Sequence, residues 1–424
     1  MAVTNRQNIR TSYWQLWLEI AKRGLGNDPL VKTSMQQLSV NPYDNDCREI
    51  IYNRIRSEDV KDLLYPEPFR KSNPGYEAQI SGKISLGKVC HTRMPWGIHP
   101  GSLTEHMSIS GRTGGGKTFL IKKIIKQLMN EETTIIIPDR KQDFCDLALK
   151  SELLYFLLED FMDNWCAPPD GVPVELWFSV LAEILAISFE LRIAAQGMIV
   201  DILKKLSKNK NGDYPTLQDI SRQLYLITQG GRGSEKESAR RIAFRINWLV
   251  STLGDACAAR QRSDWQKLIN TSWALSLAGL AGSLQSLCIT IYFAKVLFYR
   301  IYNNLRSDKL KTLIVLDEAS MIFPKTATKK TSILLDYFQQ ARAFGIGVIF
   351  ASQSMNLASE IFANTAIKVC VGGFGHGSDY NEFGSAVGLN REKLEFMKTI
   401  SRPGSAVVKD IRYPHPFTVR IDKE

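Results

Sequence analysis

The sequence predicts a doubly wound α/β fold with a mostly parallel sheet, and three features of the chain predict it. From Ile84 onward, short β-rich runs alternate with helical segments, as in a sheet covered by helices. Several runs are apolar without interruption, as in parallel strands that are buried on both faces. A glycine-rich turn also joins one run, 107–110, directly to an amphipathic helix.

The expected elements divide the chain into three parts. Strands are predicted at 107–110, 133–138, 272–277, 312–316, 347–352, 367–371, 405–409 and 417–421. Between them the strand signals stop, and amphipathic helices are expected at 153–161, 174–189, 193–206, 217–226 and 237–253. We therefore expect an N-terminal helical segment and linker (1–80), an α/β core (81–146 and 269–424) and a helical insertion (147–268). An aromatic-rich helix opens the first part, and a proline-rich linker covers 65–76.

The composition is that of a globular protein with a basic surface. Of the 424 residues, 44% are hydrophobic and 23% are charged, which argues against a disordered chain. The net charge of +11 suits a nucleic acid or an anionic membrane surface, but it is also compatible with a solubility surplus spread over the surface. Seven cysteines without metal-ligand spacing predict neither a disulfide framework nor a zinc site.

One uncharged stretch, 271–294, is long enough to span a bilayer. It contains seven serine, threonine or glutamine residues and is interrupted by Gly279 and Gly282. We therefore interpret it as a buried strand, a turn and a buried helix at about 284–304. The N-terminus lacks the order of regions that marks a signal peptide, so we expect a cytoplasmic protein.

The glycine-rich turn matches the phosphate-loop pattern G-x-x-x-x-G-K-[ST] in full. Its residues are Gly111, Arg112, Thr113, Gly114, Gly115, Gly116, Lys117 and Thr118. Glycines let backbone N–H groups surround a phosphate at the positive end of the following helix. Lys117 is expected to contact the β- and γ-phosphates of ATP, and the Thr118 hydroxyl to ligate Mg²⁺. Phe119 completes the predicted nucleotide-contact set.

A second acidic motif follows the apolar run 313–316. Asp317 and Glu318 stand where an α/β sheet presents its ligands, at the carboxyl end of a strand. Asp317 is expected to hold Mg²⁺ through water, and Glu318 to polarise the attacking water. The pair therefore predicts ATP hydrolysis, beyond ATP binding alone.

Other polar residues near strand ends are weaker candidates. Gln353 directly follows the run 347–352. It can hydrogen-bond the γ-phosphate or the lytic water, or be a surface residue without a functional role. Asp139 and Asp143 follow another strand and are equally compatible with a functional and a structural role. Arg342 is a candidate arginine finger for a neighbouring subunit, with Arg402 a weaker one; a solvated helix-end cation is the alternative.

Together these motifs resemble the HerA/FtsK superfamily of hexameric DNA-pumping ATPases. The resemblance is carried by HMSISGRTGGGKT, LIVLDEASMIF, QQARAFGIGVIFASQS and SAVVKD…PFTVRI, and within the superfamily it is closest to HerA-type and conjugative-coupling ATPases. It implies a RecA-like sheet, ATP at the subunit boundaries of a hexamer, and sequence-independent duplex DNA in a central channel. The residues that fit the family motifs are Lys117, Thr118, Asp317, Glu318 and Gln353, with Arg342 where these families place a trans-acting arginine.

The N-terminus departs from the family, because HerA proteins begin with a β-barrel and coupling proteins with transmembrane helices. Three basic clusters are candidate DNA contacts or solvated faces. They are Lys325, Lys329 and Lys330; Lys204, Lys205, Lys208 and Lys210; and Arg240, Arg241 and Arg245. The main hypothesis is a ring-forming DNA translocase that works with a nuclease or transfer machinery. The alternatives are an ATP-dependent scaffold that activates a separate effector, and a membrane-docked coupling ATPase of a secretion system.

Overall fold

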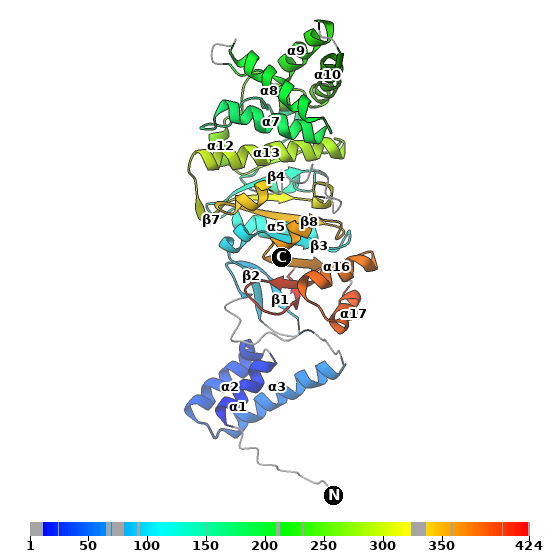
Figure 1. Cartoon of the computed structure of the whole chain (residues 1–424). Helices are drawn as coiled ribbons and strands as arrows, with labels where there is room; N and C mark the ends of the chain where they lie inside the picture. Colours follow the sequence, from blue (N-terminus) through cyan, green and yellow to red (C-terminus); the bar gives the residue numbers. More distant parts are fainter. Residues whose placement is uncertain are drawn as a thin grey trace. The chain divides into compact units, whose positions relative to one another are not determined.

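We describe the protein from a computed structural model (Figure 1). The structure describes residues 12–23, 25–64, 69, 80–90, 94–149, 151–208, 213–230, 233–323, 336–357, 359–400 and 402–422. The chain forms two compact units. Unit 1 comprises Met1–His99, Gly111–Gly116 and Ile367–Glu424, and unit 2 comprises Pro100–Ser110 and Lys117–Ala366.

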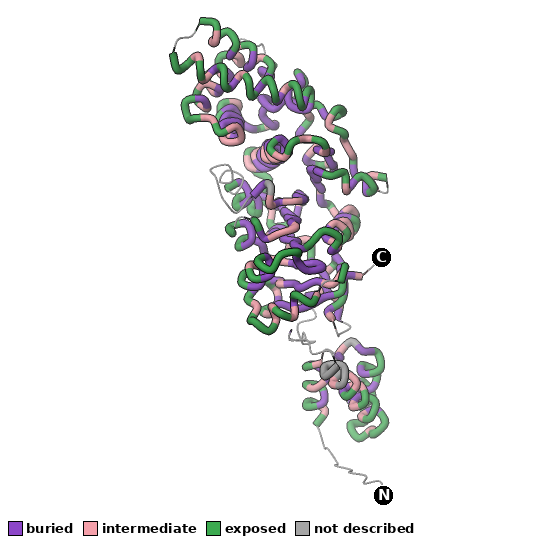
Figure 2. The backbone as a smooth tube through the Cα atoms, turned by 90° about the vertical axis from the view of Figure 1, so that its right-hand side faces the viewer, coloured by how far each residue is buried: buried purple, intermediate pink, exposed green. Residues whose placement is uncertain are grey.

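Unit 2 contains a parallel sheet in the order β3-β8-β7-β4-β6-β5. Each neighbouring pair in this order is parallel. The strands are β3 (Met107–Ser110), β4 (Thr134–Asp139), β5 (Leu154–Phe156), β6 (Trp273–Ser276), β7 (Ser307–Leu316) and β8 (Phe344–Ser352). Every residue of β3, β6 and β8 is buried (Figure 2), as the uninterrupted apolar runs predicted. The predicted strands of this unit are confirmed, and β7 begins earlier than expected.

The helices of unit 2 include four of the five amphipathic helices that the sequence predicted for the insertion. They are α5 (Lys117–Leu128), α6 (Cys145–Ala148), α7 (Val174–Ser188), α8 (Ile193–Lys208), α9 (Leu217–Gly230), α10 (Gly233–Leu253), α11 (Asp255–Ala258), α12 (Trp265–Ile269), α13 (Gly282–Tyr302) and α15 (Ser359–Ala363). Short 3₁₀ turns are η3 (Pro100–Glu105), η4 (Leu158–Asp160) and η5 (Ala319–Met321). α13 packs against β8 and α7, and α8, α9 and α10 lie beyond α7, away from the sheet (Figure 1).

One predicted helix, at 153–161, is wrong. Its first half is strand β5, which pairs in parallel with β6, and its second half is the turn η4. The Phe161 ring stacks on Trp273 with centroids 5.7 Å apart and meets Tyr292 edge-on at 5.5 Å. A short apolar run does not distinguish strand from helix by itself, so pairing with β6 decided the outcome.

The uncharged stretch behaves as predicted, with strand β6, a turn and helix α13. Among the described residues, α13 is the one helix that is both long enough and apolar enough to cross a membrane. Of its most apolar window, 78% is buried inside the protein. It even buries a charge: Lys295 is 0% exposed and donates to Asp163 at 2.6 Å and to the Asn164 carbonyl at 2.9 Å. α13 is thus a core helix of unit 2.

Unit 1 contains antiparallel strands in the order β2-β1-β11-β10-β9. They are β1 (Ile84–Val89), β2 (Pro95–Ile98), β9 (Ile367–Val371), β10 (Ser405–Asp410) and β11 (Phe417–Ile421), with helices α16 (Gly377–Val387) and α17 (Arg391–Thr399). The strands predicted at 367–371, 405–409 and 417–421 are confirmed. Their antiparallel pairing differs from the parallel arrangement of unit 2, and the mostly parallel α/β fold class holds.

The N-terminal part of unit 1 includes α1 (Tyr13–Lys22), η1 (Leu25–Asn27), α2 (Pro29–Val40) and α3 (Asn45–Leu64). Ser12 and Gln15 form a capping box at the start of α1, and Asp28 caps α2 just before Pro29; both devices satisfy N–H groups that have no partner within the helix. The three helices share a buried apolar cluster centred on Leu16 and Ile51. The linker predicted at 65–76 lies, apart from residue 69, outside the described residues, and the predicted domain boundaries stay predictions.

Candidate nucleotide-binding site

The glycine-rich turn 111–116 packs its backbone against the end of β9. A side chain at Gly111 would place its Cβ 2.1 Å from the Val371 carbonyl oxygen, and φ at Gly111 is +145°. At Gly115 the same oxygen would lie 2.5 Å from an added Cβ. Only glycine tolerates so close a backbone approach, so both glycines are needed for the shape of the turn.

Hydrogen bonds fix this turn and leave donors within it. The Arg112 N–H donates to the Gly373 carbonyl (2.7 Å), and the Gly404 N–H donates to the Gly115 carbonyl (3.2 Å). Within the described part of the chain, the N–H groups of Gly114 and Gly116 have no protein acceptor. Backbone N–H groups just before a helix are the donors that a phosphate requires. The donor set therefore fits the phosphates of a nucleotide.

Within unit 2, the strand register brings three strand ends to one edge of the sheet. Ser110 of β3 pairs with Ser352 of β8, and Leu316 of β7 pairs with Phe350 of β8. Neighbouring strands lie about 4.8 Å apart, so the residues that follow them are close in space. These residues are Lys117 and Thr118 at the start of α5, Gln353 after β8, and Asp317 and Glu318 after β7.

Asp317 is a carboxylate that burial makes costly to ionise. It is 9% exposed, and one of its oxygens accepts the Glu318 N–H at 3.0 Å. Burial raises the pKa of Asp317; the Lys141 ammonium opposes this rise and the Glu318 carboxylate adds to it. A divalent cation would relieve this cost, and carboxylate and hydroxyl oxygens are the ligands that Mg²⁺ prefers. Asp317 and the Thr118 hydroxyl therefore fit the metal of a nucleotide complex.

Glu318 adopts a strained backbone and contacts residues of the segment after β8 and of the loop after β4. Its φ is +56°, in the left-handed region, which costs a non-glycine residue about 1–2 kcal/mol. Its Oε2 accepts from the Gln353 amide at 2.8 Å and lies 3.4 Å from the Lys141 ammonium. Its backbone carbonyl accepts from Arg140 at 3.3 Å. Strain of this kind persists where the surroundings over-determine it, often at functional sites.

Asp139 has a structural role, as its four contacts indicate. Its carboxylate accepts the N–H groups of Lys141 (3.2 Å), Asp143 (3.1 Å) and Phe144 (2.9 Å), and the Tyr155 hydroxyl (3.0 Å). With its carboxylate oxygens occupied in this way, Asp139 shapes the loop that follows β4.

Sequence reasoning missed the two cations that this loop positions. Arg140 is buried and also donates to Gln285 of α13 at 2.6 Å. Burial lowers the pKa of Arg140, while the Glu318 and Asp317 carboxylates oppose that change. Both Arg140 and Lys141 directly follow an apolar strand, and that position was the available signal.

A family model described as the central domain of the helicase HerA matches residues 84–296, half of the chain. The chain belongs to the HerA family. It is therefore a member of the HerA/FtsK superfamily of P-loop ATPases, as the motifs predicted.

Two curated relatives match the chain at low identity. The DNA import protein CedB of Sulfolobus acidocaldarius is 22% identical over 418 residues, covering 95% of this chain and 67% of CedB. The DNA double-strand break repair helicase HerA of Sulfurisphaera tokodaii is 22% identical over 283 residues, covering 64% of this chain and 55% of that protein. The chain thus spans a little over half of that HerA and about two thirds of CedB.

Solved structures share the RecA-like fold of this HerA-family chain. The conjugative coupling protein TrwB superposes with a TM-score of 0.63 at 11% identity, covering 84% of this chain and 92% of that one. VirB4 of Thermoanaerobacter pseudethanolicus superposes with a TM-score of 0.62 at 13% identity, covering 80% and 96%. TrwB has also been solved with the ATP analogue ADPNP and with ADP and Mg²⁺.

The two arginine candidates of this HerA-family protein lie in different units of the chain. Arg342 precedes β8, whereas Gln353 follows it, and nine residues at about 3.3 Å each separate these ends by about 30 Å. Arg342 is exposed and pairs with Glu105 at 2.6 Å. Arg402 belongs to the turn before β10, two residues from Gly404, whose N–H donates to the phosphate loop. Arg342 therefore does not reach its own chain's carboxylates.

The three basic clusters differ in how far the structure describes them and in whether their side chains are paired. Lys325, Lys329 and Lys330 lie outside the described residues, as does Lys210. Lys204 lies 3.5 Å from Glu175, and Lys205 and Lys208 stand in the last turn of α8, where cations are stabilised by the helix dipole. Arg240, Arg241 and Arg245 are exposed on α10.

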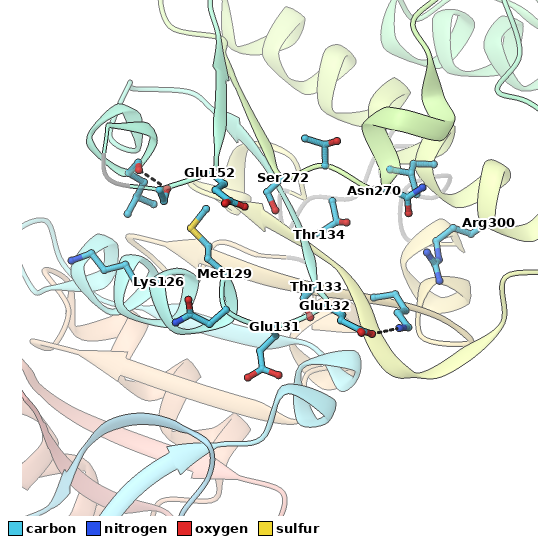
Figure 3. Close-up of a pocket in the computed structure, with 16 residues that line it drawn as sticks. Lys126, Met129, Glu131, Glu132, Thr133, Thr134, Glu152, Asn270, Ser272 and Arg300 are labelled. Atoms are coloured by element: carbon cyan, nitrogen blue, oxygen red, sulfur yellow. Dashed lines mark hydrogen bonds and ion pairs between the residues drawn. The ribbon is translucent and has the colours of Figure 1, made fainter.

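A pocket of about 960 Å³ lies at the opposite edge of the parallel sheet from the carboxylates (Figure 3). Thr133 and Thr134 at the start of β4 line it, together with Ser272 just before β6. Its charged residues are of both signs and include Lys126, Glu131, Glu132, Glu152 and Arg300. Mixed charge of this kind does not favour a triphosphate.

Proposed function

We propose that this protein is a Mg²⁺-dependent ATPase that moves DNA as a ring of subunits. The observation that carries the proposal is that β3, β8 and β7 are adjacent parallel strands of unit 2 with their carboxyl ends at one edge. Gln353 and the pair Asp317–Glu318 directly follow β8 and β7, and Lys117 begins the helix that comes after β3. Membership of the HerA family supports ATP as the nucleotide. A DNA import protein that matches 95% of the chain supports DNA as the cargo.

Each residue has a distinct role in this proposal. The N–H groups of the turn 111–116 and the Lys117 ammonium bind phosphate oxygens. Thr118 and Asp317 hold Mg²⁺, which neutralises developing charge when bound. Glu318 accepts a proton from the attacking water. Gln353 donates to Glu318 at 2.8 Å, so it orients the carboxylate and links its position to the end of β8.

Lys141 has a positioning role in the same proposal. Its ammonium lies 3.4 Å from Glu318 Oε2 and is about half exposed. A cation so close donates to the carboxylate and helps to hold it in one orientation. Because the Lys141 side chain is partly exposed, the pair contributes little to folding stability, and its importance lies in the orientation of Glu318.

Arg342 is the residue that supports the assembly of subunits into a ring. Since about 30 Å of β8 separates this arginine from its own chain's Gln353, it can act only on ATP held by a neighbour. Its 62% exposed side chain is available for that contact once the Glu105 pair opens. An arginine supplied in trans stabilises transition-state charge, and this arrangement makes hydrolysis depend on assembly.

The deciding experiment is phosphate release with and without duplex DNA on a sample of measured oligomeric mass. We expect DNA to raise turnover several-fold, and salt to weaken that response because phosphate contacts release counterions. An Arg342→Ala subunit and a Glu318→Gln subunit should each assemble without activity and regain activity when mixed. Turnover that ignores DNA at every salt concentration would instead favour a scaffold that activates a separate effector.

A further inference from the structure

Helix α10 has one face that is buried in unit 2 and one that is open. The buried residues repeat at helical spacing and are Ala239, Ile242, Ile246, Leu249 and Leu253. Asn247 on the flank contacts Ser221 of the neighbouring helix α9 through a short hydrogen bond. These contacts hold α10 in place.

Two aromatic side chains stand on that open face. Phe244 is 69% exposed and Trp248 is 36% exposed. They are four residues apart, which places their Cβ atoms about 6 Å from each other along the same side of the helix. Leaving the Phe244 ring mostly in water, and the Trp248 ring partly so, forgoes some of the stabilisation that burial would give, so the open face has the character of a binding surface.

Arginines surround these rings. Arg240, Arg241 and Arg245 are all exposed, and no acidic residue occurs from 238 to 253. Arg241 pairs with Glu237 one turn earlier, whereas Arg240 and Arg245 form no ion pair or hydrogen bond with any described residue. The open face thus combines aromatic rings with clustered positive charge. At its C-terminal side, Arg245 and Trp248 line a pocket of about 210 Å³ in which Glu190 is the acidic residue.

We infer that the open face of α10, formed by Arg240, Arg241, Phe244, Arg245 and Trp248, binds single-stranded DNA. This inference rests on the proposed function, in which DNA is the cargo. Unpaired bases stack on exposed aromatic rings, whereas a duplex hides the faces of its bases. The arginines bind phosphates of the same strand. The positive charge favours a nucleic acid over an uncharged protein surface.

Two other helices, α8 and α1, carry either a cluster of cations or exposed aromatic rings, but not both. Helix α8 carries a lysine cluster but no aromatic residue. Helix α1 exposes Trp14 and Trp17, but the cations at its end, Lys22 and Arg23, both pair with Glu19. Trp14 is therefore a matched control, because it is an exposed ring without free cations beside it.

The test is fluorescence anisotropy on the full chain with a labelled oligothymidine strand and a mixed-sequence duplex of the same length. Phe244→Ala and Trp248→Ala should each weaken single-strand binding by about 5-fold to 150-fold, and change duplex binding by less than about twofold. Phe244→Tyr should keep binding and Phe244→Leu should lose it, because stacking needs a ring. Trp14→Ala should behave as wild type. Phe244 is mostly exposed, so its substitutions leave the fold intact.

Two results would overturn the inference. One is wild-type single-strand affinity in Phe244→Leu and Trp248→Ala. The other is a lowered oligomeric mass in these variants with unchanged single-strand affinity, which would make the face a subunit interface. If duplex DNA still raises ATP turnover in either case, the proposed function stands and only the inference about α10 fails.

Discussion

Changing Glu318 to glutamine isolates the proton-accepting role of this side chain. Glutamine has the same shape, and its remaining oxygen can still accept from the Gln353 amide, which now lies 2.8 Å from the carboxylate. The backbone at φ +56° is held by the strand and loop around it and does not depend on the charge. Glu318→Gln should therefore fold and bind ATP as the wild type does.

The expected loss of turnover follows from the chemistry of that position. A positioned general base contributes about 10²-fold to 10⁴-fold, or about 3–5 kcal/mol of barrier. The nearby Lys141 ammonium, 3.4 Å from Oε2, offsets none of this loss, because it can only donate. We expect phosphate release to fall within that range while the affinity for ATP changes by less than about twofold.

The assay pairs single-turnover phosphate release with binding of a fluorescent ATP analogue. Glu132→Gln is the matched control: this glutamate side chain is 95% exposed and lines the pocket at the opposite edge of the sheet (Figure 3). It should hydrolyse ATP at the wild-type rate. If Glu318→Gln also turned over at that rate with normal binding, Glu318 would not be the base.

Three further predictions concern the turn, a buried histidine and a buried ion pair. Gly111→Ala should weaken ATP binding by roughly tenfold or more, because the added Cβ would lie 2.1 Å from the Val371 carbonyl oxygen. Titration with a fluorescent ATP analogue measures this change. Burial lowers the pKa of His106 from 6.5 to about 3. Between these two pKa values the unfolded chain binds a proton that the folded chain does not. The unfolding free energy should therefore fall by about 1.4 kcal/mol for each pH unit that the pH is lowered within this range. His106→Gln should remove this contribution to the slope in urea titrations, and an unchanged slope would contradict the assignment. Lys295→Met leaves Asp163 buried without its partner and should cost about 3–5 kcal/mol, part of which the added Asp163→Asn change should restore; equal stability of the single and double variants would argue against a paired charge.

Most strands and helices followed from local patterns in the sequence, and so did the phosphate loop, whereas β1 and β2 were not predicted and β5 was predicted as a helix. The pattern G-x-x-x-x-G-K-[ST] requires only neighbouring residues, and the apolar runs of β3, β8 and β9 are continuous along the chain. Helix α13 was separable from a membrane span because serines, glutamine and glycines interrupt the uncharged stretch. Such features act within a few residues and can be recognised without the fold.

The tertiary structure alone decided which distant residues meet. Lys141 and Glu318 lie 177 residues apart, and they become neighbours because β4 pairs with β7. The segment 154–156 forms strand β5 because it pairs with β6. Asp139 has a structural role because three backbone N–H groups and the Tyr155 hydroxyl donate to its carboxylate. Local patterns fix backbone preference, whereas strand order and long-range pairing depend on how the whole core packs. The sequence therefore determined the chemistry that the chain carries, and the packing of the sheet decided which side chains surround it.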